Sequence, residues 1–154
     1  VLADAPLDAS SSVKAFNHKL GECGVTFFAR ADSAKKLKRN FPASLSGQPM
    51  LLPTPTTTMR RLIDRWLDEH QIHPLIAAEF EDSALMKVFG QAGVGAFPAP
   101  SVIEREVIKQ YDVKPVGRVE SLRERFFAIS VERKLKHPAI VAITASASED
   151  LFGD

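Results

Sequence analysis

The chain has 154 residues, of which 45% are hydrophobic and 25% are charged, as in an ordinary globular domain. Twenty basic and nineteen acidic residues leave a net charge of +1, which excludes a broad positive surface for nucleic acid or anionic membrane. The single cysteine, Cys23, excludes an intrachain disulfide, and no segment contains the roughly 20 apolar residues of a membrane span. We therefore expect a cytoplasmic protein. Because the chain begins at Val1 without methionine, we also expect it to be part of something longer.

The first 47 residues predict strands followed by a short helix. Residues 1–3 are strand-like and residues 8–12 form a polar turn, while residues 15–28 predict a long bent strand or a hairpin. Asp32 and Ser33 are expected to cap a helix that buries Ala34, Leu37 and Phe41 and ends before Pro42. The basic residues of this helix indicate a solvated face more than a binding patch.

Residues 50–63 are the most informative stretch. Met50 to Leu52 predict a buried strand, and Pro53 and Pro55 stop it. A helix follows, because apolar residues recur at i, i+3, i+4, i+7 and i+8 from Met59. Hydroxyl groups around a helix N-terminus with free N–H groups can hold an anion or a polar ligand, although an N-cap alone is equally plausible. The residues concerned are Thr54, Thr56, Thr57 and Thr58.

The remaining elements alternate between strands and helices, which predicts an α/β fold with a mainly parallel sheet. We expect strands at 75–80, 113–119 and 126–131, with Pro115 at a sheet edge or bulge. Asp82 or Ser83 should cap a helix, and Ser101 to Glu104 form a capping box for another. The first apolar helix face is predicted to be Leu85, Val88, Phe89 and Ala92. A final helix is predicted to begin at His137–Pro138 and to end at Gly153, with an apolar face of Ile140, Val141, Thr144, Ala147 and Leu151.

The segment from Gly93 to Pro98 joins a helix to a strand. Gly93 can adopt the left-handed conformation that closes a helix, and Gly95 permits close approach of a backbone or a ligand. Phe97 and Pro98 are expected to end the strand as a bulky lid. A helix end followed by a buried strand explains both glycines without any ligand.

No enzyme signature is present, so we expect no catalytic residue, no cofactor and no metal site. His70 and His73 are a more plausible surface pair than metal ligands, since such sites need three or four spaced ligands. Cys23 lacks a basic neighbour that would activate it as a nucleophile. Asp4, at the end of a strand, is compatible with facing a ligand or with capping a turn.

In this order, the threonine turn with its helix, Leu75–Phe80, Ala92–Pro98 and His137–Ile140 resemble the effector-binding domain of LysR-type transcriptional regulators. The resemblance covers nearly the whole chain and implies a fold like type 2 periplasmic binding proteins, with one complete lobe plus part of the other. It implies that residues 1–27 end lobe I and include the outgoing crossover, that 28–126 form lobe II, and that 127–154 return to lobe I.

The resemblance also implies a function and an effector site between the lobes. Within the family, the chain is similar to regulators of sodium/proton antiporter genes, which implies sodium or lithium as the effector. A small anion would suit the helix N-terminus better. Homo-oligomers would form through the effector domain, and DNA would bind only through a missing N-terminal helix-turn-helix. The alternative is a solute-binding protein of the same fold that serves transport. The implied effector-binding residues are Asp4, Thr54, Thr56, Thr57, Thr58, Phe97 and Pro98.

Overall fold

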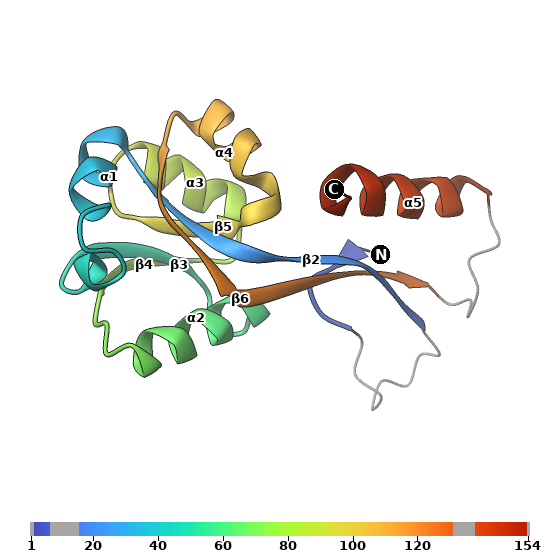
Figure 1. Cartoon of the computed structure of the whole chain (residues 1–154), viewed down its shortest axis with the longest axis horizontal. Helices are drawn as coiled ribbons and strands as arrows, with labels where there is room; N and C mark the ends of the chain where they lie inside the picture. The colour runs from blue at the N-terminus through green and yellow to red at the C-terminus, as the bar shows by residue number, and fades with distance from the viewer. Residues whose placement is uncertain (1, 7–15, 131–137, 154) are drawn as a thin grey trace. The chain divides into compact units, whose positions relative to one another are not determined.

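The computed structural model describes residues 2–6, 16–130 and 138–153, and the side chain of Ile140 is outside this description. The polar turn predicted at 8–12 and the predicted role of His137 therefore lie outside the described residues. Contacts divide the chain into two compact units, which we call unit 1 (Val1–Cys23 and Arg123–Asp154) and unit 2 (Gly24–Leu122). Two long strands, β2 (Phe16–Ala29) and β6 (Lys114–Ser130), each contribute residues to both units (Figure 1).

The described part of unit 1 consists of strands and one helix. Strand β1 (Leu2–Ala3) pairs antiparallel with the end of β6, so that Leu2 lies opposite Ala128. Helix α5 (Pro138–Phe152) packs on these strands through its last turns, since the Phe152 ring lies 5.3 Å from that of Phe126. The predicted apolar face is only partly correct. Thr144 and Ala147 are half-buried, whereas Val141 and Leu151 are 41% and 46% exposed.

Unit 2 contains a parallel strand pair and an antiparallel ladder. Strands β3 (Pro49–Pro53) and β4 (Leu75–Phe80) are parallel and are connected by helix α2 (Thr58–Glu69). Strand β5 (Phe97–Pro100) pairs antiparallel with β2, in a sheet of order β1-β6-β2-β5. The α/β class is confirmed, but within the described residues parallel pairing is limited to β3 with β4 and to one bridge between Met50 and Ala96.

Helix α2 supplies one side of the main core. Its predicted stripe is confirmed, because Met59, Ile63, Trp66 and Leu67 are all buried. The Trp66 ring stacks on Phe27 of β2 at a centroid distance of 5.5 Å. These apolar contacts hold the helix, and therefore its N-terminal turn, against the strands of unit 2.

Helix α1 (Ala31–Leu37) differs at both ends from the predicted helix. It begins directly after Arg30, so Asp32 lies inside the first turn and binds Arg30 in an ion pair of 2.9 Å instead of capping the helix. It ends at Leu37, well before Pro42. Phe41 still packs against the core, but from the turn beyond the helix. The basic residues of this segment are exposed, as predicted; they are Lys35, Lys36, Lys38 and Arg39.

Helix α3 (Ser83–Gln91) presents the opposite face from the one predicted. Asp82 is the N-cap and accepts a hydrogen bond from the Ala84 N–H at 2.9 Å, as expected. Gly90 lies against the ring of Phe97, where any side chain would collide with it. Gly90 therefore faces the interior, and the predicted core face is exposed while a different set is buried. The exposed residues are Leu85, Val88 and Phe89, and the buried ones are Met86, Lys87 and Gly90.

The capping box predicted at Ser101 does not form. Residues Ser101–Ile103 are a 3-10 turn, and helix α4 spans Glu104–Tyr111. The buried Ser101 hydroxyl instead hydrogen-bonds Thr26 of β2 at 2.9 Å, and Thr26 donates to the Glu104 carboxylate at 2.8 Å. Strand β6 is also continuous where two strands were predicted. In the described sheet, β1 pairs with Phe127 and Ala128 at the end of β6, and β2 lies on the other side of β6. Pro115, near the start of β6, therefore has a neighbouring strand on one side, which is where a proline is tolerated.

Candidate functional site

The threonine turn joins the end of β3 to the start of α2 in unit 2. Thr57 is the N-cap, and its hydroxyl accepts a hydrogen bond from the Arg60 N–H at 3.2 Å while donating to the Thr54 carbonyl at 3.0 Å. The hydroxyl hydrogen and one of its two lone pairs are therefore used inside the turn. Thr57 shapes the turn, and effector contact at Thr57 stays a prediction.

The other three threonines are placed differently. The hydroxyls of Thr54 and Thr56 lie 3.3 Å apart, with Thr56 exposed and Thr54 half-buried. Thr58 is half-buried, and its hydroxyl has no hydrogen-bond partner among the described residues. The N–H groups of Thr58 and Met59 also have no backbone acceptor in the described part of the chain, as expected for the first helical positions. The turn thus offers free donors and hydroxyl oxygens together.

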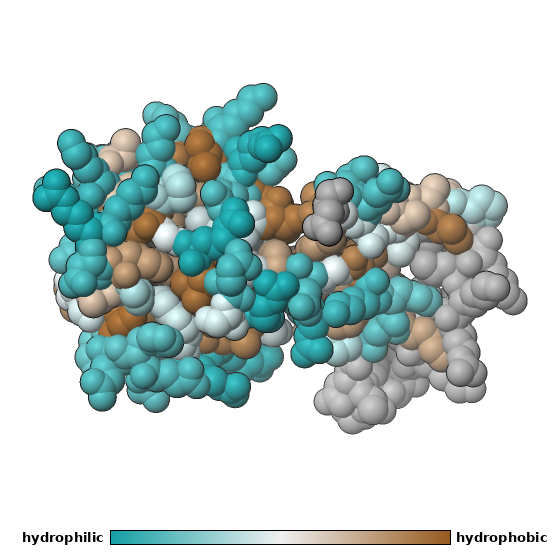
Figure 2. All heavy atoms as spheres, in the orientation of Figure 1, coloured by the Kyte–Doolittle hydropathy of each residue, from teal (hydrophilic) through white to brown (hydrophobic). Residues whose placement is uncertain are grey.

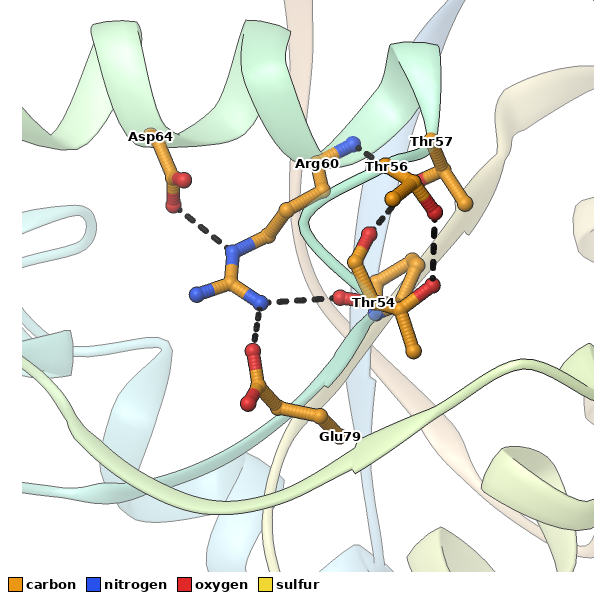
Figure 3. A network of polar contacts seen from close by, with 7 residues as sticks. Thr54, Thr56, Thr57, Arg60, Asp64 and Glu79 are labelled. Atoms are coloured by element: carbon orange, nitrogen blue, oxygen red, sulfur yellow. Dashed lines mark hydrogen bonds and ion pairs between the residues drawn. The ribbon is translucent and has the colours of Figure 1, made fainter.

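A buried arginine holds this turn in place. Arg60 is 6% exposed, and its guanidinium lies between three oxygens, as Figure 3 shows. It donates to the Pro53 carbonyl and to Asp64, each at 2.9 Å, and forms an ion pair with Glu79 of β4. Burial lowers the pKa of Arg60, but the hydrogen bonds to Glu79 and Asp64 outweigh burial, and the net direction is upward. The guanidinium therefore stays charged while it ties β3, α2 and β4 together.

Arg60 was not singled out from the sequence, in which it lies four residues before Asp64 on the predicted helix. Its burial was missed, although a signal was available. Arg60, Ile63 and Leu67 fall at i, i+3 and i+7, which places Arg60 at the edge of the core-facing stripe. A long side chain at such a position can bury its stem while its charged end reaches polar groups.

Phe97 and Pro98 are core residues at the start of β5. Phe97 is fully buried, and its ring stacks on that of Phe28 at a centroid distance of 5.5 Å. Phe97 and Pro98 both pair with β2 in the antiparallel ladder. The prediction that they end a strand as a bulky lid is therefore wrong. Gly93 and Gly95 behave as expected, since Gly93 has φ +84° and a side chain at Gly95 would collide with the Pro49 carbonyl. Effector contact at Phe97 and Pro98 stays a prediction.

Asp4 belongs to unit 1, whereas the other predicted site residues belong to unit 2. Asp4 is half-buried just beyond β1. Near it lies Glu124 of β6, which the sequence reasoning missed. Burial, and then the charge of Asp4, raise the pKa of Glu124 to about 7. Side chains alternate between the two faces of a strand, and in β6 Leu122 and Glu124 are buried whereas Arg123 and Arg125 are exposed. The spacing of two residues from Leu122 was the signal that places Glu124 on the inner face of β6.

A cavity of about 160 Å³ lies in unit 2 near the start of β3, away from the threonine turn. It is lined by none of the predicted site residues; Arg30, Lys36, Gln48 and Gly95 are among its walls. The Nδ1 atom of His70 donates a hydrogen bond to the Trp66 carbonyl at 2.9 Å, and His73 lies at the following turn. Among the described residues, no three His, Cys, Asp or Glu side chains gather as metal ligands. No helix within the described ranges is long and apolar enough to cross a membrane.

Comparison with known proteins identifies relatives of the whole chain. The chain is 32% identical over 152 residues to the transcriptional activator protein NhaR of Escherichia coli K12, and equally to that of Shigella flexneri. These alignments cover 99% of this chain and 50% of each relative, so the chain spans about half the length of the curated relatives it matches.

Solved structures show the same fold at low identity. The regulatory domain of the HypT M206Q mutant from Salmonella typhimurium has a TM-score of 0.69 at 14% identity, covering 96% of this chain and 72% of that chain. The effector domain of AmpR from Pseudomonas aeruginosa has a TM-score of 0.66 at 16% identity, covering 90% and 66%. The family model described as the LysR substrate binding domain matches residues 15–150. The chain therefore belongs to the LysR substrate-binding domain family, whose fold resembles type 2 periplasmic binding proteins, and it is an NhaR homologue.

Proposed function

We propose that this chain is the effector-sensing region of a LysR-type transcriptional activator that acts in the cytoplasm. The 32% identity to NhaR along the whole chain is the observation that carries the proposal. In this proposal DNA binds through a helix-turn-helix, which is not among the elements that the structure describes. A transport role, the alternative from sequence, has no support from the relatives, which are transcriptional activators.

Residues 28–126 would form the complete lobe II, with 1–27 and 127–154 contributing to lobe I. Support comes from the division into compact units, which separate at 23/24 and 122/123, within a few residues of these bounds. The strands β2 and β6 would then be the two crossover segments, since each has residues in both units. Effector binding would act by shifting the population of lobe arrangements.

The threonine turn would contact the effector. It combines the free hydroxyl of Thr58, the exposed hydroxyl of Thr56 and free N–H groups at the positive end of a twelve-residue helix. This set suits a small anion or a hydroxylated molecule. Sodium or lithium, which the resemblance implies, would have to use the hydroxyl oxygens against the helix dipole. We therefore propose a small anion for the turn and treat sodium or lithium response as a separate property of the protein.

The test is transcription from the target promoter with the intact protein while sodium, lithium and small carboxylates are varied at constant ionic strength. Thr56→Val and Thr58→Val should each reduce anion sensitivity by about tenfold, because each removes one ligand hydroxyl. Thr57→Ser is the matched control, since serine keeps the capping hydroxyl. An unchanged response in both valine variants would exclude the turn as an effector contact.

Homo-oligomer formation through unit 2 is part of the proposal. Apolar side chains are exposed on α3 and on β4, which has β3 as its only partner in the described sheet. A group of exposed apolar residues on neighbouring elements commonly marks a protein interface. A second copy of the chain is the proposed occupant, because LysR-type regulators assemble as homo-oligomers. The residues are Leu75, Ile76, Leu85, Val88 and Phe89. The face of unit 2 visible in Figure 2 is largely hydrophilic, with separate hydrophobic patches.

A further inference from the structure

Unit 1 contains a carboxylate that the proposed effector turn does not explain. Glu124 lies on β6 with 3% of its surface exposed, and its Oε2 atom has no hydrogen-bond partner among the described residues. An ionised carboxylate in such a place is strongly disfavoured unless a partner compensates its charge. Native proteins rarely keep such a group without a reason.

The strand register brings a second carboxylate to the same face. Strand β1 pairs Leu2 with Ala128 and Ala3 with Phe127, and Asp4 follows directly after its end, so the same register continued by one residue would place Asp4 beside Phe126. On that register Glu124 would be the diagonal neighbour of Asp4, on the same side of the strands. The effect of the Asp4 charge on Glu124, which raises its pKa, agrees with this placement.

The surrounding charges do not neutralise the pair in the described structure. On β6, Arg123 and Arg125 flank Glu124 but alternate to the exposed face, and Arg123 binds Glu22 of β2 at 3.3 Å. Lys19 of β2 also binds Glu22, at 3.3 Å. Among the described residues of unit 1, the remaining charged or titratable groups are Cys23, His18, which bonds Ser130, and the exposed acids Glu149 and Asp150 on α5. Two acidic groups therefore share one face with no described cation between them.

We propose that Asp4 and Glu124 together bind a small hard cation. Carboxylate oxygens are the preferred ligands of such ions, and a cation would supply the partner that Glu124 Oε2 lacks. Backbone carbonyls or water would complete the coordination. Cation binding at this pair is separate from the small anion proposed for the threonine turn, and it does not rest on the proposed function. The chemistry is shared by sodium, lithium, magnesium and calcium, so the experiment must separate the monovalent from the divalent ions.

The test is the thermal unfolding of the intact protein at pH 8, in choline chloride of constant ionic strength. Sodium, lithium, magnesium and calcium are each added in place of choline. At least one should raise the midpoint in a saturable way, because binding to the folded state stabilises it. Glu124→Gln and Asp4→Asn should each weaken the apparent affinity by about tenfold or more. Glu120→Gln, on the same strand but exposed, is the matched control and should leave the affinity unchanged.

Two results would overturn the inference. If no cation shifts the midpoint relative to choline, the pair binds no cation. If Glu124→Gln and wild type respond equally, the ion binds elsewhere. Failure of the proposed function is distinct, because it would appear as loss of promoter response with normal cation binding. A variant that fails to fold is recognised by its unfolding curve in choline alone, and Asp4→Asn then provides the test.

Discussion

Arg60 offers the sharpest test of how the threonine turn is held. We expect Arg60→Met to lower the free energy of unfolding by about 2–4 kcal/mol. The hydrogen bond from the charged guanidinium to the half-buried Pro53 carbonyl contributes about 1.5–3 kcal/mol. Asp64 and Glu79 are 49% and 41% exposed, so each ion pair adds only about 0–1 kcal/mol. Methionine keeps most of the apolar stem, which confines the loss to the polar contacts.

Urea-induced unfolding followed by fluorescence measures this change. Trp66 is the single tryptophan, is 5% exposed, and belongs to unit 2, so its signal reports the unit that contains the turn. Arg61→Met is the matched control, because Arg61 is the exposed neighbour and its loss should cost less than about 0.5 kcal/mol. Arg60→Lys should fall between the two, since lysine keeps the charge without the planar fork. If Arg60→Met and Arg61→Met have equal effects, Arg60 does not hold the turn.

Four further outcomes are expected. Thr57→Ala should lower the free energy of unfolding in urea by about 1 kcal/mol, and Thr57→Ser should retain most of the wild-type value. Equal stability of the alanine variant and wild type would show that the Thr57 cap does not stabilise the turn. Gly95→Ala should destabilise by about 1–3 kcal/mol, because its Cβ would lie 2.9 Å from the Pro49 carbonyl; equal stability would refute the contact. Val88→Glu should reduce the mass of the intact protein in light scattering if α3 forms the oligomer interface, while an unchanged mass places the interface elsewhere. In choline buffer, the free energy of unfolding should fall as pH rises from about 4.5 to about 7, because Glu124 keeps its proton in the folded protein and loses it in the unfolded chain. The urea midpoint at each pH measures this dependence, and Glu124→Gln should flatten it.

The local patterns of the sequence predicted what local physics determines. The strand at Met50–Leu52, the turn and the stripe of α2 were correct because a 3.6-residue period and two prolines leave few alternatives. The same reasoning failed where a distant residue decides. Ser101 carries a capping motif, yet its hydroxyl binds Thr26, 75 residues away in the chain. Local hydrogen bonding cannot anticipate that competitor.

The candidate site was predictable only in part. Thr54, Thr56, Thr57 and Thr58 were found from their hydroxyls, but sequence could not separate the capping Thr57 from the accessible Thr56. Glu124 escaped because a carboxylate on an inner strand face contradicts the usual relation between polarity and exposure. Such exceptions are where function is expected, and the alternation of buried and exposed residues in β6 is the signal that finds them.

The contact between Gly90 and Phe97 has a consequence for how this protein can vary. Because residue 90 has no side chain, this side of α3 can lie against Phe97. Leu85 and Val88 then face the solvent and are available to another molecule. A larger residue at 90 would push the helix off the Phe97 ring and redraw that outer surface without altering any residue on it. Interior packing and subunit recognition would then change together in evolution, through a position that never touches a partner.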